Sequence, residues 1–286
     1  MKLIGKAFLV YIVFVIATMV GGAIVSKLPL SPPAMPPGTT QMGLFAATLV
    51  GSVVLVPGLI PLAMGLGGRF PIRWLALGLL LYVANGVNTA IELTIFSTMG
   101  GTSYLLVVNL LQFVAMSAAL AWMFGSGQFV PSLPRMGIGA WAWRIGVAWL
   151  AFPVIYLVFG MAVGPFVIAH YQAGEGLLRL PSMDVILRTQ LLRSLLFLGC
   201  SLPVIMLWTS SRRRLIVTLG LAHAVMVGLY GLSSAYWLPM VLRVGHSIEI
   251  IADSFAYALV LVLLFYPRTR TATASATAPV PITTAA

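Results

Sequence analysis

The sequence predicts an all-α fold: a polytopic bundle of about eight transmembrane helices with both termini in the cytoplasm. Three observations lead to this fold class. Of the 286 residues, 60% are hydrophobic and only 7% are charged, and the apolar residues form long runs separated by short polar breaks. A soluble domain of this length needs far more charged surface, whereas each run approaches the roughly 20 residues that span a bilayer.

Eight such runs follow one another along the chain. The first, after MKLIGK, resembles a signal peptide, but its apolar core is long and no A-x-A site follows, so we expect it to remain as a helix. Together the runs define one membrane domain, residues 1–266, and the low-complexity segment 267–286 is expected to be a disordered cytoplasmic tail. The predicted spans are 7–25, 43–66, 74–97, 103–124, 143–164, 185–209, 214–236 and 244–266.

Basic residues predict the orientation of the bundle. With the N-terminus inside, eleven fall on the cytoplasmic side and three outside, a strong positive-inside bias typical of a bacterial inner membrane protein. The formal charge of +11 therefore reflects helix ends, so we expect the lipid bilayer and no nucleic acid as partner. The inner set is Lys2, Lys6, Arg69, Arg73, Arg135, Arg144, Arg212, Arg213, Arg214, Arg268 and Arg270, and the outer set is Lys27, Arg179 and Arg243.

The eighth span carries an unusual polar face. His246, Glu249 and Asp253 are spaced i, i+3, i+7, which places them within about 60° of one another on a helix. Arg243 lies one turn before His246. The chain has only five acidic residues, so two of them on one face of an apolar helix indicate a role inside the membrane.

Other spans place polar residues at overlapping depths. Left separately in lipid, three acids and one or two arginines would cost about 10 kcal/mol or more. We therefore expect Arg193, with Arg188 as a secondary partner, to meet the acids in a buried cluster near the external side. The predicted cluster is Asn85, Asn88, Glu92, Gln190, Arg193, His246, Glu249 and Asp253, with Arg188, Asn109, Gln112, Arg243 and His223 as secondary members.

Three stretches carry most of these residues: IELTIF in the third span, QLLRSLLFLGCSLPVI in the sixth, and LPMVLRVGHSIEIIADSFAY entering the eighth. They resemble a group of uncharacterised bacterial multipass membrane proteins. The resemblance covers the membrane body thinly and implies no particular activity, and Asp253 stands where the group has a smaller polar residue. The matching positions are Glu92, Gln190, Arg193, Pro203, Arg243, His246, Glu249, Ser254 and Phe255.

Three functions remain open from the sequence. The first is a transporter-like protein for protons or a small polar or anionic solute, with three acids, Arg193 as counter-charge and His246 as the titrating group. The second is an intramembrane hydrolase of lipid-linked substrates, in which His246 and Glu249 act as acid and base or, with Glu92, as metal ligands. The third is a non-catalytic assembly protein with structural ion pairs. No cofactor motif is present, and neither a substrate nor an oligomeric state is indicated.

Overall fold

The computed structural model describes residues 2–126 and 136–266 of the chain. Within them the protein is helical and has no strands, only two isolated β-bridges. Eight helical stretches are long and apolar enough to cross a membrane, which confirms the predicted all-α class. They are α1 (Leu3–Val25), α2 (Gln41–Met64), the third span (Phe70–Phe96), α5 (Thr102–Phe124), α6 (Ile138–Gln172), α7 (Met183–Leu207), the seventh span (Arg212–Ser234) and α10 (Met240–Phe265).

Most span limits lie within a few residues of those predicted, but the fifth does not. Residues 143–164 were expected, with an external loop from Pro165 onward; instead α6 continues through Pro165 to Gln172. A proline is tolerated inside a membrane helix when neighbouring groups satisfy the freed backbone. The two extra helical turns matter because they place Tyr171 beside the eighth span.

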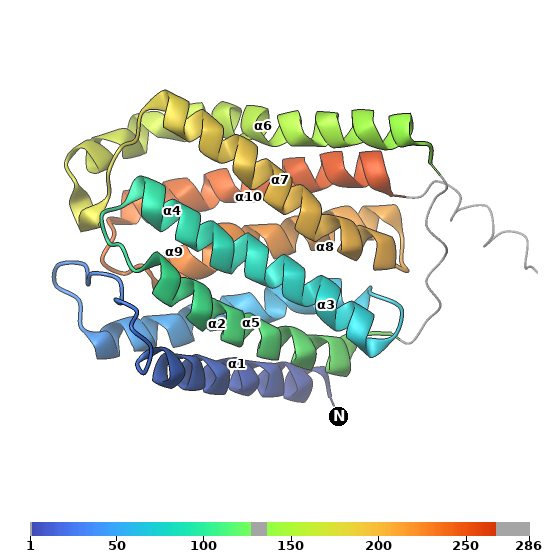
Figure 1. Cartoon of the computed structure of the whole chain (residues 1–286), viewed down its shortest axis with the longest axis horizontal. Coiled ribbons are helices and arrows are strands. Elements are labelled where there is room, and N and C mark those ends of the chain that lie inside the picture. Colours follow the sequence, from blue (N-terminus) through green and yellow to red (C-terminus); the bar gives the residue numbers. More distant parts are fainter. Residues whose placement is uncertain (1, 127–135, 267–286) are drawn as a thin grey trace, which may run out of the picture.

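The helices form a flat bundle with α6 along one edge and α1 along the other (Figure 1). The first helix packs mainly on α5, and α10 lies between α6 and the seventh span. Close approach of α6 and α10 depends on small residues: a Cβ on Gly245 would stand 3.2 Å from Val163 and Val167. The buried apolar side chains form one continuous core, with members from α1 through α10.

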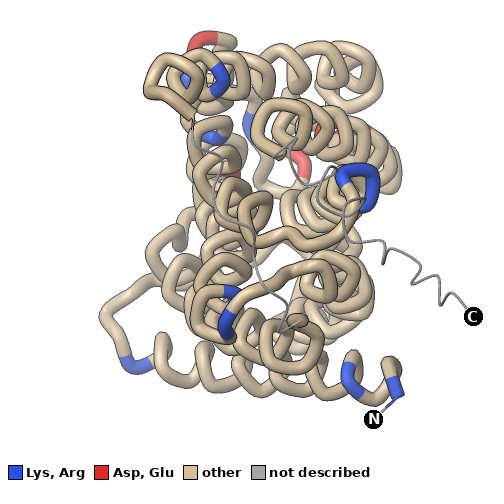
Figure 2. Tube along the Cα trace, turned by 90° about the vertical axis from the view of Figure 1, so that its right-hand side faces the viewer, with Lys and Arg blue, Asp and Glu red and all other residues tan. Residues whose placement is uncertain are grey.

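An even number of spans brings both described ends of the chain to one end of the bundle. We call this end, which holds the loops 65–69 and 208–211, the basic end, because Lys2, Arg69 and the run Arg212–Arg214 lie there. The opposite end holds the loops 26–40, 97–101, 173–182 and 235–239. Seen from the basic end, the acidic residues gather in the half of the bundle away from the N-terminus (Figure 2).

Which end faces the cytoplasm remains a prediction from the positive-inside rule. Three of the basic residues behind that prediction, Arg135, Arg268 and Arg270, lie outside the described residues, as does the predicted tail 267–286.

Two spans are not regular α-helices. The third is divided into α3 (Phe70–Leu81), the π-helical η1 (Tyr82–Val87) and α4 (Asn88–Phe96), and the seventh into α8 (Arg212–Ala224), the π-helical η3 (Val225–Leu229) and α9 (Tyr230–Ser234). The two π segments are joined where Asn85 Nδ2 donates to the Met226 carbonyl over 2.7 Å. Such wide turns occur frequently at functional sites.

At the basic end, Arg73 folds inward and closes the end of α5. Its side chain donates to the carbonyls of Ala121 over 3.0 Å and Ser126 over 2.9 Å, and also to that of Gly68. The residue is only 6% exposed. Because the last carbonyls of a helix have no partner within it, a buried guanidinium here satisfies them and fixes the loop before α3.

The first prediction concerns this arginine. Arg73→Gln should lower the free energy of unfolding by about 2 kcal/mol, because hydrogen bonds to a charged donor are lost inside the protein. Unfolding can be followed in detergent with a thiol-reactive dye, since the single cysteine, Cys200, is buried.

Arg69→Gln is the matched control, with the same charge change at an exposed position four residues earlier. Equal effects of the two substitutions would show that Arg73 acts through charge alone and not through its contacts with α5.

Candidate functional site

A cavity of about 290 Å³ lies between the third span, α6, α7, the seventh span and α10. Its inner part is lined by the polar groups of these helices. It reaches the opposite end of the bundle, where Ser97, Leu178 and Trp237 from the connecting loops line it. A space of this size is at the small end of the range for ligand pockets in proteins, about 300–1,000 Å³.

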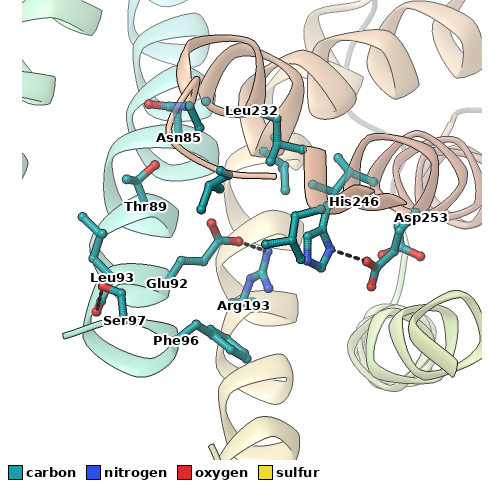
Figure 3. A pocket seen from close by; sticks show the side chains of 18 of the residues that line it. Asn85, Thr89, Glu92, Leu93, Phe96, Ser97, Arg193, Leu232, His246 and Asp253 are labelled. Atoms are coloured by element: carbon teal, nitrogen blue, oxygen red, sulfur yellow. Dashed lines mark hydrogen bonds and ion pairs between the residues drawn. The ribbon is translucent and has the colours of Figure 1, made fainter. Parts of the chain in front are cut away.

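One side of the cavity is formed by an ion pair between α4 and α7. Arg193 Nη2 donates to Glu92 Oε1 over 2.9 Å, and Nη1 donates to Gln190 Oε1 over 3.2 Å. The guanidinium also lies 5.8 Å and 5.5 Å from the ring centres of Phe152 and Phe197. Figure 3 shows this ion pair as the dashed line between Glu92 and Arg193, among the other side chains that line the cavity. Arg193 is 5% exposed, so the pair is shielded from bulk water on its α7 side.

The facing side of the cavity is formed by α6 and α10, and His246 of α10 connects the two helices. Its Nδ1 lies 2.8 Å from Glu249 Oε2 and its Nε2 lies 3.0 Å from the Tyr171 hydroxyl. An ionised carboxylate only accepts hydrogen bonds, so Nδ1 then carries the proton, and Tyr171 donates to neutral His246. Gly160 of α6 makes room for this arrangement, because a Cβ there would stand 3.3 Å from Glu249 Oε1.

Asp253 lies one turn further into the bundle on the same face of α10. It lines the cavity and is 6% exposed, and its Oδ1 is buried with no hydrogen-bond partner. The charges of Glu249 and Arg193 are within electrostatic reach of this carboxylate. A buried acceptor left without a partner is rare in proteins and is itself a reason to look for a missing proton or ligand.

Three further predicted members lie close to the cavity. Asn85 and His223 line it, and His223 Nε2 lies 3.0 Å from the hydroxyl of Ser201. Asn88 is 1% exposed and neither polar atom of its amide has a partner, but the residue is not among those lining the cavity.

The structure places the remaining predicted members elsewhere. Arg188 is exposed and sits 3.9 Å from Asp184 at the start of α7. On α5, Gln112 donates to Thr18 of α1 over 3.0 Å and Asn109 lies against Gly86. Arg243 donates to the carbonyls of Leu232 and Ser233, which end the seventh span. Arg188 therefore stays within α7, and the other three side chains contact neighbouring helices outside the cavity.

Two tyrosines belong to the site that sequence reasoning missed. Tyr171 was assigned to a loop, and Tyr156 stands among apolar residues of α6 with no polar neighbour in sequence to single it out. In the structure Tyr156 lines the cavity within reach of the charges of Arg193, Glu92, Glu249 and Asp253. Only the helical register of α6 relative to α10 could have revealed either residue.

The suggested metal ligands do not converge. Within residues 2–126 and 136–266, no group of three or more His, Cys, Asp or Glu side chains is placed to hold a metal ion. His246 and Glu249 bond to each other, while Glu92 is occupied by Arg193 on another helix. The candidate set Glu92, His246 and Glu249 therefore lacks the convergence that a first coordination shell needs.

Eight helices of sufficient length and apolar character, with charged groups kept in the interior, decide the class of this protein. The chain is a multipass membrane protein. No family model, no curated protein and no solved structure matches it. Any function must therefore be argued from the cavity itself.

The second prediction compares the partners of the ion pair. Arg193→Gln should lower the free energy of unfolding by about 3–5 kcal/mol, because it leaves buried carboxylates without their one arginine. Glu92→Gln should cost about 1 kcal/mol or less, because the carboxylate is 36% exposed and Arg193 keeps other acids nearby. Titration with SDS in mixed micelles measures both.

On the same helix, Arg188→Gln provides the control, since its side chain is exposed and removed from the cavity. If Arg193→Gln and Glu92→Gln lower the free energy of unfolding equally, Arg193 does not stabilise several acids at once and the prediction is wrong.

Proposed function

We propose that this chain is a transporter-like protein of a bacterial inner membrane, which binds a small solute or protons in the cavity between α4, α7 and α10. The observation that carries the proposal is a cavity that reaches one end of the bundle and holds charged groups within the spans. Transport proteins place their binding sites near the middle of the membrane among interrupted helices. Here the third and seventh spans, both interrupted by π segments, line the cavity.

A purely structural role for the polar residues accounts for less of the geometry. Structural ion-pair networks are stable when each buried member is satisfied. Of the residues that line this cavity, Asp253 at Oδ1 and Arg193 at Nε have no hydrogen-bond partner. Unsatisfied groups next to an open space favour a site that is completed by something that enters it.

The hydrolase hypothesis has less support. Its metal-dependent form needs converging ligands, which Glu92, His246 and Glu249 do not provide. An acid–base form would need a nucleophile, or a water held between His246 and a carbonyl carbon, whereas both ring nitrogens of His246 are already in contact with Tyr171 and Glu249.

The third prediction tests whether the cavity is reachable. In Thr89→Cys, a thiol replaces a partly buried cavity-lining hydroxyl of α4. A small, neutral methanethiosulfonate should modify it in membranes, and a membrane-impermeant one should do so from one side. The unmodified protein is the blank, because Cys200 is 1% exposed and does not line the cavity.

A thiol on the same α4 helix at an exposed position that does not line the cavity, Thr94→Cys, gives the comparison. If Thr89→Cys reacts no faster than the buried Cys200 under native conditions, the cavity is closed to solutes and the proposed function is wrong.

The fourth prediction concerns orientation. We infer that the basic end is cytoplasmic, which places the opening of the cavity on the external face. Green fluorescent protein fused after Ala286 should then fluoresce in a bacterial host, since it does not mature when exported unfolded. A dark fusion, with alkaline phosphatase active at the same point, would reverse the orientation.

A further inference from the structure

We propose that the cavity binds a small organic cation, with an ammonium group held by Asp253 and Glu249 and an apolar body against the aromatic wall. This inference rests on the proposed function, because the cation must be able to enter the cavity. It narrows that function to one substrate class. The juxtaposition that leads to it is an excess of carboxylates over basic groups in a space whose remaining walls are apolar.

The first step is the charge of the cavity wall. Among the described residues that line it, three are acidic, Glu92, Glu249 and Asp253, and Arg193 is the one Lys or Arg. Arg193 is bonded to Glu92, so two carboxylates on α10 face the space without an arginine of their own. Even a protonated His246, which is bonded to Glu249, would leave Asp253 uncompensated.

The second step is the state of Asp253 itself. The residue is more than nine-tenths buried, and its Oδ1 has neither a hydrogen-bond donor nor access to solvent. An ionised carboxylate in such surroundings is costly unless a cation or a donor accompanies it. Within the described residues no donor contacts Oδ1, and Arg193, whose charge reaches Asp253, donates its hydrogen bonds to Glu92 and Gln190. The cavity, which Asp253 lines, is the place from which a partner can come.

The third step is the character of the other walls. Phe96 and Phe197 line the cavity, as do Phe152, Trp237 and Tyr156, with aliphatic side chains between them. Faces of aromatic rings attract cations, as the position of Arg193 over Phe152 and Phe197 already illustrates. Apolar and aromatic walls offer nothing to a hydrated inorganic ion, but they suit the hydrocarbon part of an organic amine.

The same contacts argue against an anion, the alternative kept open by the sequence. The two terminal nitrogens of Arg193 are engaged by Glu92 and Gln190, and only its Nε is without a hydrogen-bond partner. An anionic ligand would have to share Arg193 with Glu92 while lying near two further carboxylates. Repulsion by like charges in a site of low dielectric makes that unfavourable.

The experiment uses the Thr89→Cys variant of the full chain in membranes. Its thiol is modified with two methanethiosulfonates of similar size, one carrying a trimethylammonium group and one a sulfonate. After division by their rates with a free thiol, the cationic reagent should react at least about tenfold faster. Adding Asp253→Asn should reduce this preference, and Asp184→Asn, an exposed acid on α7, should leave it unchanged.

Protection tests the ligand class directly. Phenylethylammonium should slow the modification of Thr89→Cys by the neutral reagent, whereas 3-phenylpropanoate, of matching shape and opposite charge, should not. If both protect equally, or neither protects, the inference is wrong.

Two failures can be told apart. When no reagent of any charge reaches the thiol, the cavity is closed and the proposed function fails. When the neutral reagent modifies the thiol but the cationic and anionic reagents react at equal normalised rates, the cavity is accessible and the proposed preference for a cation is wrong. Melting of Asp253→Asn and Asp184→Asn in the chain that keeps Thr89, followed through Cys200, shows whether each substitution leaves the protein folded. The charge preference of Thr89→Cys alone needs no change to the acids.

Discussion

The interior of this protein depends on one arginine. Among the described residues of the cavity wall, Arg193 alone brings a guanidinium into a region of low dielectric. The aromatic rings of Phe152 and Phe197 lie against it, and Gln190 and Glu92 accept from its terminal nitrogens. Without it the acids of α4 and α10 would face one another uncompensated. The helices around the cavity thus surround a charge whose isolation in lipid would be energetically costly.

That arrangement gives the cavity two unlike sides. On the α4–α7 side the charges are paired and the ion pair is rigidly supported. On the α6–α10 side the chain Tyr171–His246–Glu249 ends next to Asp253, where a carboxylate oxygen is unsatisfied. Hydrogen-bonded chains of this kind hold their members in fixed tautomers and positions. Asp253 is not a member of this chain, and its Oδ1 stays without a partner.

Much of this was visible in the sequence, and the reasons for the rest are physical. Apolar run length and the energetic penalty of isolated charges predicted the spans and the meeting of Glu92 with Arg193. Periodicity also placed His246, Glu249 and Asp253 on one face, but it could not say which acid the arginine would take. Tyr171 was missed because Pro165 suggested a loop, and the π segments leave no mark in a pattern of apolar residues.

The paired π segments have a mechanical consequence. A π turn contains about one residue more than an α turn, so each span stores an extra residue at the level of Asn85 and Met226. Expelling that residue from the third span would rotate everything beyond it by about 100° around the helix axis. Glu92 would then swing away from Arg193 while the basic end stayed in place. The register that brings Glu92 to Arg193 therefore depends on the extra residue held in the third span.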